Sequence, residues 1–306
     1  MSAIVASHLH RRFGQVEAVV DLSLAVEDGE IYGLIGPDGA GKTTTLRMLA
    51  AVLKPTGGTA TVAGYDVVRQ SERLRRLVGY MPQHFSLYGD LSVMENLTFF
   101  ADIFGVRGRE RRERIERLLH FAQLEAFTGR AAAHLSGGMK KKLALACCLI
   151  HRPQVLLLDE PTNGVDPVSR REFWDILGDL HLEGVTILVT TPYMDEAERC
   201  NQVGLMHAGR IIRQGAPAEL RSLTPGVMLA VYTPHLLQAE AVLPEAPGYL
   251  AHQVYGDRVH VFLQEEHADP SRLQEFLRAR DIVVQLVRRD TPRLEEAFVH
   301  LMSRES

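Results

Sequence analysis

The stretch that decides the fold is Ile31–Thr44, which reads IYGLIGPDGAGKTT. Its first five residues are an apolar run typical of a buried strand, and Thr43–Leu53 shows helical spacing. Between them, Gly36–Thr43 fits the pattern G-x-x-x-x-G-K-S/T. Glycines allow the backbone to fold with its N–H groups turned inward, and the helix that follows presents its positive end to an anion. The stretch therefore predicts a phosphate-binding turn between a strand and a helix.

The side chains of this loop indicate a nucleoside triphosphate bound with Mg²⁺. Lys42 can reach the β- and γ-phosphates, and the Thr43 hydroxyl can complete the Mg²⁺ shell. A chance glycine-rich turn is the alternative, but strand, loop, Lys-Thr pair and helix coincide here. The loop alone fits many nucleotide hydrolases and does not choose among them. The predicted nucleotide-binding residues are Gly36, Pro37, Asp38, Gly39, Ala40, Gly41, Lys42, Thr43 and Thr44.

The composition is that of an ordinary soluble globular protein, and a length of 306 residues suits two unequal domains. The net charge of -4 argues against a broad nucleic-acid surface, which needs a basic excess. The sequence has no stretch that approaches the roughly 20 apolar residues of a membrane span. The three cysteines, Cys147, Cys148 and Cys200, have no metal-ligand spacing and suit a reducing compartment. We therefore expect a cytoplasmic chain, in which any membrane crossing is done by another subunit.

Hydrophobic patterning predicts an α/β core with an all-helical lobe over residues 1–222. Short strands are expected at Val16–Val20 and Leu22–Val26, ahead of the phosphate loop. The pattern turns helical over residues from about 85 to 150. Val155–Leu158 and Val185–Val189 are then short apolar runs typical of buried parallel strands, and a helical segment joins them.

Residues 223–306 have a different pattern and predict a small accessory domain. Strand-like and helix-like segments follow one another in the order β-α-β-β-α-β, with the last strand at Ile282–Val287 and a closing helix at Pro292–Met302. This order suggests a ferredoxin-like α+β fold. The domain boundary is expected in the linker Leu223–Gly226, and the tail sequence shows no catalytic constellation.

Two further motifs follow the phosphate loop. Leu135–Met139 reads LSGGM and opens a helix, where N–H groups and the helix dipole form a second anion site; alone, such a segment is more often a helix cap. Val155–Glu160 reads VLLLDE, a buried strand that ends in two carboxylates. Asp159 can bind Mg²⁺ directly or through water, and Glu160 can polarise an attacking water. The phosphate loop, the LSGGM segment and the VLLLDE segment follow one another in this order. This order disfavours a simple helix cap at LSGGM and a solvated turn at Asp159 and Glu160.

With these motifs in this order, the chain resembles the nucleotide-binding subunits of ABC ATPases over most of its first 220 residues. The resemblance implies a P-loop NTPase fold, ATP as the ligand and ATP hydrolysis as the activity. It places Gln83 in the loop that senses Mg²⁺ or water and contacts the membrane subunit. Gln83 is therefore a catalytic candidate together with Glu160, and a metal-site candidate together with Asp159. It places Phe13 where an aromatic ring stacks on adenine, although Phe13 could equally be a core aromatic.

The same resemblance implies a dimer. Two subunits of the family sandwich ATP, and Gly164–Asp166 matches the loop that crosses their interface. Ser136, Gly137 and Gly138 would then contact ATP held by the other subunit. A single chain is expected to hydrolyse ATP poorly, because half of each site is missing.

Three segments resemble the ABC-2-type exporters of drugs, polysaccharides and cations. They are LYGDLSVMENL at Leu87–Leu97, YMDEAE at Tyr193–Glu198 and PRLEEAF at Pro292–Phe298. This resemblance implies that the chain powers efflux of a drug or another small molecule at the cytoplasmic face of the cell membrane. Its implied partners are transmembrane permease subunits and a second ATPase subunit or half, and no nucleic acid is expected. The sequence does not name the cargo.

One position departs from the family pattern. Pro192 stands where the family has a histidine that contacts the γ-phosphate, and proline has neither a side-chain donor nor an N–H group. The Thr191 hydroxyl would point elsewhere if the strand continues to this residue. We therefore hypothesise an impaired hydrolytic site, used mainly for ATP binding and dimer closure, beside a more competent site on a partner. Tandem ATPase polypeptides of this exporter group show such asymmetry, and the chain could be the first half of one.

Two other classes of function stay open on the sequence alone. One is a soluble, non-transport ABC ATPase that acts on ribosomes or nucleic acid. Such relatives usually carry a second cassette with a long charged linker, or coiled-coil arms, and this sequence shows neither. The other is a nucleotide-sensing regulatory module, which only Pro192 and the tail domain support.

Overall fold

The computed structural model describes residues 1–84 and 87–305, and the chain divides into two compact units, Met1–Ala216 and Pro217–Ser306. The division precedes the boundary expected after residue 222. The reason is that α8 (Pro217–Arg221) packs against α11 (Leu294–Glu305) of the second unit.

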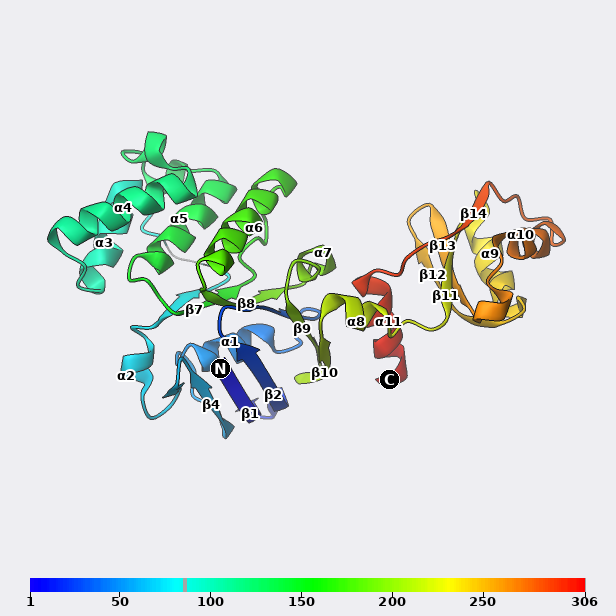
Figure 1. The fold of residues 1–306 in the computed structure, drawn as a ribbon, viewed down its shortest axis with the longest axis horizontal. Coiled ribbons are helices and arrows are strands. Elements are labelled where there is room, and N and C mark those ends of the chain that lie inside the picture. Colours follow the sequence, from blue (N-terminus) through cyan, green and yellow to red (C-terminus); the bar gives the residue numbers. More distant parts are fainter. Residues whose placement is uncertain (85–86, 306) are drawn as a thin grey trace. The chain divides into compact units, whose positions relative to one another are not determined.

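A six-stranded sheet forms the centre of the first unit, in the order β10-β9-β3-β8-β7-β6 (Figure 1). The strands from β9 to β6 are parallel, and β10 runs antiparallel at one edge. Every residue of β3, β7 and β8 is buried, which explains their continuous apolar runs. The bounds are β3 Ile31–Ile35, β6 Val78–Met81, β7 Val155–Asp159, β8 Thr186–Thr191, β9 Gln202–His207 and β10 Arg210–Gly215.

Because these strands are parallel, the carboxyl ends of β3, β6, β7 and β8 all lie at the same end of the sheet, which we call the carboxyl edge. Open α/β sheets bind ligands at that edge. The register aligns Ile35 with Thr191 and Asp159 with Thr190, so the loops after these strands start side by side. The predicted strand Ile31–Ile35 and the α/β core are confirmed.

The helical lobe consists of α3 (Val93–Ile103), α4 (Gly108–Ala122) and α5 (Gly137–Leu149), which pack against one another (Figure 1). The lobe was expected from about residue 85, and residues 85 and 86 lie outside the described residues. The helix after the phosphate loop, α1, covers Lys42–Leu49 and ends before the expected Leu53, because Ala51 takes a left-handed φ of 53°. The other helices of this unit are α2 Ser71–Leu74, α6 Pro167–Leu182 and α7 Met194–Ala197.

A second, four-stranded sheet of this unit corrects the expected N-terminal pattern. Its order is β2-β1-β4-β5, with β1 Ser2–Phe13, β2 Val16–Glu27, β4 Gly57–Val62 and β5 Tyr65–Asp66. The two short strands predicted at Val16–Val20 and Leu22–Val26 are one strand. A bulge at Asp21, with φ 52°, bends it, but pairing with β1 continues at Leu22 opposite Leu9.

The second unit confirms the predicted β-α-β-β-α-β order. Its strands form an antiparallel sheet in the order β12-β13-β11-β14. The last strand starts at Leu286 and not at the predicted Ile282; Ile282 and Val284 are buried in the core without joining the ladder. The elements are β11 Val227–Tyr232, α9 Leu236–Val242, β12 Tyr249–Tyr255, β13 Arg258–Leu263, α10 Pro270–Arg278 and β14 Leu286–Arg289.

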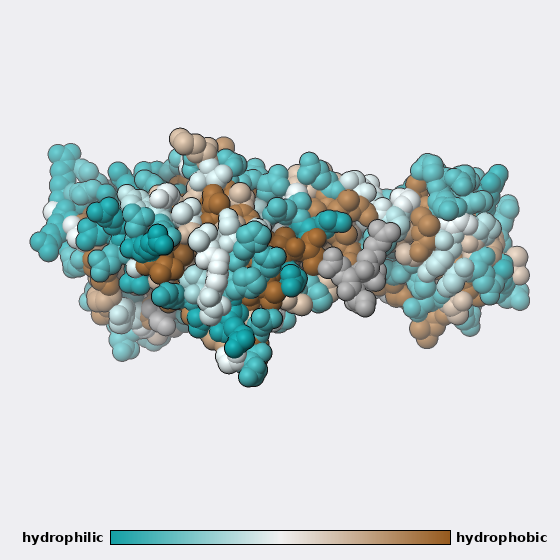
Figure 2. All heavy atoms as spheres, turned by 90° about the horizontal axis from the view of Figure 1, so that it is seen from below, coloured by the Kyte–Doolittle hydropathy of each residue, from teal (hydrophilic) through white to brown (hydrophobic). Residues whose placement is uncertain are grey.

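The surface agrees with the composition. Figure 2 shows one face of the molecule, where hydrophilic residues predominate and hydrophobic residues form small patches. Across residues 1–84 and 87–305, none of the helices combines the length and the apolar character that crossing a bilayer requires.

Candidate functional site

The phosphate loop between β3 and α1 depends on glycines at two places. Gly41 has φ 105°, and a Cβ atom there would lie 2.4 Å from the carbonyl oxygen of Ala18. A Cβ on Gly36 would lie 2.0 Å from the carbonyl oxygen of Met206. Side chains are therefore excluded at both positions, and the loop keeps the tight turn that the motif predicts.

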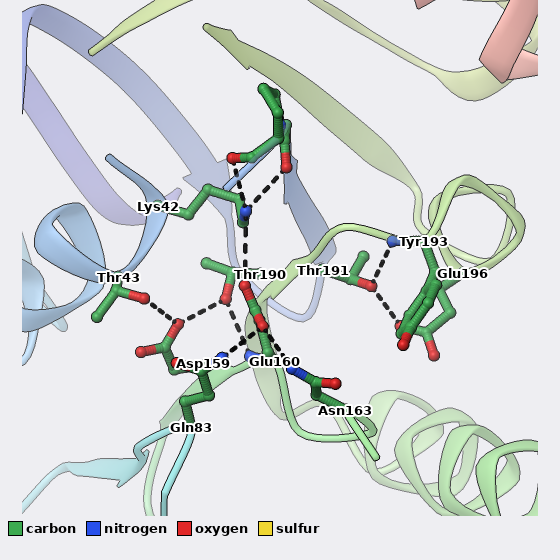
Figure 3. A network of polar contacts seen from close by, with 12 residues as sticks. Lys42, Thr43, Gln83, Asp159, Glu160, Asn163, Thr190, Thr191, Tyr193 and Glu196 are labelled. Atoms are coloured by element: carbon green, nitrogen blue, oxygen red, sulfur yellow. Dashed lines mark hydrogen bonds and ion pairs between the residues drawn. The ribbon is translucent and has the colours of Figure 1, made fainter. Parts of the chain in front are cut away.

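Lys42 is buried within this loop, with 4% of its surface exposed. Its Nζ donates to the carbonyl oxygens of Gly36 at 2.8 Å and Pro37 at 3.1 Å, and it lies 3.5 Å from Glu160 Oε1 (Figure 3). A buried ammonium needs such partners to offset its loss of hydration. The loop thus holds a cation directly against the second carboxylate of the VLLLDE motif.

Asp159 ends β7 and is fully buried. The hydroxyls of Thr43 and Thr190 donate to its Oδ1 at 2.9 and 2.8 Å (Figure 3). Its Oδ2 is buried and has no hydrogen-bond partner among the described residues. A buried carboxylate oxygen without a donor is costly, and a cation would satisfy it.

Glu160 is the residue on which the donors of several loops converge. Its backbone takes a left-handed φ of 45°, and its N–H donates to the carbonyl oxygen and hydroxyl of Thr190 at 3.1 and 3.0 Å. The amides of Gln83 and Asn163 donate to Oε2 at 2.7 and 3.1 Å (Figure 3). The carboxylate is therefore oriented from two loops, and it lies beside Lys42 on a backbone conformation that is uncommon for residues other than glycine.

A cavity of about 500 Å³ lies at this edge of the sheet. Pro192 lines it and offers no hydrogen-bond donor. Thr191 does not compensate, because its hydroxyl donates to Glu196 Oε2 at 2.6 Å. The cavity is lined by Ala18, Asp38, Gly39, Ala40, Gly41, Lys42, Thr43, Thr44, Gln83, Glu160, Asn163, Pro192 and Tyr193.

The LSGGM segment does not line this cavity. Ser136 is exposed and caps α5, where its Oγ accepts from the Met139 N–H at 3.3 Å. Gly137 is also exposed, whereas Gly138 is buried against Ser169 of α6. Within one chain, this motif and the phosphate loop are therefore separate sites.

Phe13 ends β1 and is 45% exposed, so it is not a core aromatic. The guanidinium of Arg11 lies 4.3 Å from the centre of its ring. One face of the ring is thus engaged by a cation, and the residue does not line the cavity at the phosphate loop.

The sequence reasoning missed three residues that act on the site. Thr190 and Asn163 hold the carboxylates, as described above. Lys141 of α5 donates to the carbonyl oxygen of Gln83 at 3.1 Å. Burial lowers the pKa of Lys141, and the nearby Glu160 and Asp159 carboxylates oppose this shift. A polar residue directly after a predicted strand is the signal that could have found Thr190, which follows Val185–Val189.

Comparison with known proteins places this geometry in a family. The family described as ABC transporter matches residues 19–163. The chain is 44% identical over 309 residues to the "Probable multidrug ABC transporter ATP-binding protein YbhF" of Escherichia coli, across 98% of this chain and 52% of that protein. It therefore spans about half the length of this relative. It is 38% identical over 301 residues to the Nod factor export ATP-binding protein I of Burkholderia orbicola, across 97% of this chain and 96% of the relative.

Solved structures agree with this assignment. The ATP-binding subunit of an ABC transporter matches with a TM-score of 0.66 and 29% identity, over 72% of this chain and 92% of that one. A dimeric, post-hydrolysis state of the ATP-binding cassette MJ0796 with ADP and phosphate matches with a TM-score of 0.63 and 25% identity, over 70% and 98%. Together with the phosphate loop and the paired carboxylates, these matches show that the chain belongs to the ATP-binding proteins of the ABC transporter family.

Proposed function

We propose that this chain is an ATP-binding and ATP-hydrolysing subunit that powers an ABC-type membrane exporter. One observation carries the proposal. Lys42 lies 3.5 Å from Glu160 and Thr43 donates to Asp159, and Lys42, Thr43 and Glu160 line one cavity, which combines groups for binding phosphate with a group for activating water.

In this proposal, residues Gly36–Thr44 bind the phosphates of ATP. The inward-facing N–H groups and the start of α1 favour an anion, and Lys42 adds a positive charge. The exposed ring of Phe13 stacks on adenine. Lys42 then exchanges its contact with Glu160 for the phosphates, which leaves Glu160 available to a water molecule.

The residues at the end of β7 fit a Mg²⁺ ion. Asp159 has a buried oxygen without a donor, the Thr43 hydroxyl lies 2.9 Å from its other oxygen, and the Gln83 amide, which also carries an oxygen, lies beside Glu160. Oxygen ligands of this kind are those that Mg²⁺ prefers. When bound, the ion neutralises charge on the β- and γ-phosphates.

Glu160 is proposed as the group that polarises the attacking water, and Gln83 as the side chain that orients it. The reaction is ATP + H₂O to ADP + phosphate. Because Pro192 supplies no donor to the cavity, we propose that hydrolysis at this site is slow and that ATP binding there serves chiefly to close a dimer.

The site is proposed to be completed by a second ATPase subunit or half. Ser136, Gly137 and Gly138 lie outside the chain's own phosphate cavity, which supports contact with ATP held by the partner. The match to a dimeric cassette with ADP and phosphate supports the same arrangement.

We further propose that the motor works with transmembrane permease subunits at the cytoplasmic face of the membrane and expels a drug or another small molecule. The names of the multidrug and Nod factor export relatives support an exporter. They give no support to a ribosome-associated or regulatory role.

The test is the rate of phosphate release by the purified chain, alone and with its membrane subunits, beside a Lys42→Ala variant. We expect weak turnover alone, a severalfold rise with the membrane subunits, and loss of both in Lys42→Ala. Turnover that is indifferent to membrane subunits but rises with ribosomes or nucleic acid would overturn the exporter proposal.

A further inference from the structure

A buried carboxylate outside the proposed site joins two segments that line the phosphate cavity. Glu196 belongs to α7 and is 2% exposed. Its Oε1 accepts from the Thr162 hydroxyl at 2.6 Å, and its Oε2 accepts from the Thr191 hydroxyl at 2.6 Å. The second of these contacts is drawn in Figure 3. One side chain therefore bridges the turn after β7 and the end of β8.

On the β8 side, this bridge holds the segment that contains Pro192. The Thr191 hydroxyl also accepts from the Tyr193 N–H at 3.0 Å. The guanidinium of Arg170, on α6, lies 4.8 Å from the centre of the Tyr193 ring, and its Nε is 4.0 Å from Glu196 Oε1. Residues of α6, α7 and β8 therefore hold Pro192 and Tyr193 in place in the cavity wall.

On the β7 side, the same bridge acts next to Glu160. Thr162 directly precedes Asn163, whose amide donates to Glu160 Oε2 at 3.1 Å, and whose N–H donates to the Glu160 carbonyl oxygen at 3.2 Å. A shift of Thr162 would therefore move a donor that orients Glu160.

We propose that Glu196 is a positioning residue for ATP hydrolysis, which fixes the distance between the Glu160–Asn163 turn and the Pro192–Tyr193 turn. The inference rests on the proposed function. A carboxylate accepts hydrogen bonds at both oxygens, whereas a glutamine accepts at one and places an amide donor against the other hydroxyl. Because Glu196 does not line the cavity, its loss should slow the chemical step and spare nucleotide affinity.

The decisive variant is Glu196→Gln in the full chain. We expect kcat for ATP to fall about tenfold, because small displacements of catalytic groups have effects of this order or larger. The KM for ATP and the affinity for a fluorescent ATP analogue should stay within about twofold. Asp195→Asn is the matched control. The Asp195 side chain lies on the same helix and is 71% exposed, and the loss of its charge should leave kcat unchanged.

Two milder variants keep the test valid if Glu196→Gln folds poorly. Thr162→Val and Thr191→Val are near-isosteric, and each removes one arm of the bridge. Each variant should lower kcat. The fold-reduction in kcat of the double variant should be smaller than the product of the two single fold-reductions, because both hydroxyls donate to the same carboxylate.

Hydrogen exchange in the nucleotide-free chain gives a readout that does not need turnover. Amide exchange should accelerate in Glu196→Gln at both residues 161–165 and residues 191–194, while the melting temperature stays within a few degrees. Unchanged kcat in an active wild-type background would overturn the inference alone. Joint loss of ATP affinity and of the melting transition would also overturn it, by showing a purely structural role. Absence of turnover in the wild type with its membrane subunits would instead overturn the proposed function.

Discussion

Pro192 is the residue whose chemistry departs most from that expected of the site. It lines the phosphate cavity directly after the strand β8, and it brings no donor to it. The hydroxyl of its neighbour Thr191 donates to Glu196 at 2.6 Å and is not directed into the cavity. Pro192 therefore forms part of the cavity wall without offering a hydrogen-bond donor.

Introducing the donor should therefore raise the rate. We expect Pro192→His to increase ATP turnover of the assembled complex by about tenfold or more, because one donor directed at developing charge has effects of this order or larger. Single-turnover phosphate release at saturating ATP measures the effect. Pro192→Ala, which adds a backbone N–H but no side-chain donor, should stay close to the wild-type rate. Equal rates and equal ATP affinity for all three proteins would contradict the hypothesis of an impaired site.

At the scale of elements, the start of α5 depends on its contact with α6. A Cβ on Gly138 would lie 2.5 Å from Ser169 Oγ and 2.6 Å from Ser169 Cβ. At Gly137 the nearest contact of a Cβ would be the carbonyl oxygen of Gly164, at an ordinary 3.8 Å. The two adjacent glycines therefore differ in the space around them.

This difference predicts opposite effects on stability. Gly138→Ala should force α5 and α6 apart and cost about 1–3 kcal/mol, which lowers the melting temperature by about 2–4 °C per kcal/mol in a unit of this size. Gly137→Ala should leave the melting temperature unchanged or slightly higher, since alanine favours a helix. Differential scanning calorimetry of both variants is the measurement. An equal loss in both would show that the α5–α6 contact does not matter for stability.

The helix α11 is joined to β13 by a buried pair that makes the second unit sensitive to pH. His260 Nδ1 lies 2.9 Å from Glu296 Oε1, and both side chains are almost fully buried. The pKa of Glu296 is lowered from its ordinary 4.5: burial raises it, but hydrogen bonds from His260 and from the Arg293 N–H outweigh this. Because the folded state binds the proton less readily, this stabilisation is present above about pH 4.5 and is lost as pH falls through the lowered pKa.

Glu296→Gln should consequently destabilise the second unit by about 1–3 kcal/mol near neutral pH. The difference from the wild type should shrink as the pH falls below about 4.5. Denaturant unfolding at a series of pH values measures it, with the exposed Glu266→Gln as the control. A difference that stays constant with pH would mean that the carboxylate charge does not contribute.

At the scale of the whole molecule, the separation of the LSGGM segment from the phosphate loop predicts complementation between chains. Glu160→Gln removes the group that activates water, and Ser136→Ala removes the contact offered to a partner, so each homodimer should be nearly inactive. In a mixture, half of the dimers carry both variants, and one of their two sites combines an intact Glu160 with an intact Ser136. The mixture should recover about a quarter of wild-type turnover if the dimer is symmetric. A mixture no more active than its two components would exclude this arrangement.

The amino-acid sequence by itself determined the phosphate loop, the buried strand with its two carboxylates and the order of elements in the second unit. Each of these depends on contiguous residues: glycines that permit a tight loop before Lys42, an apolar run before Asp159, and alternating patterns in the tail. Local chemistry and local backbone freedom suffice to specify them.

Only the tertiary structure decided which side chains meet. Gln83, Asn163 and Thr190 converge on Asp159 and Glu160 because β3, β8, β7 and β6 adjoin in that order with a defined register. Strand order and register arise from pairings between segments far apart in the chain, which local patterning does not encode. The same reason explains why β2, whose pairing with β1 continues across the bulge at Asp21, looks like two short strands in the sequence.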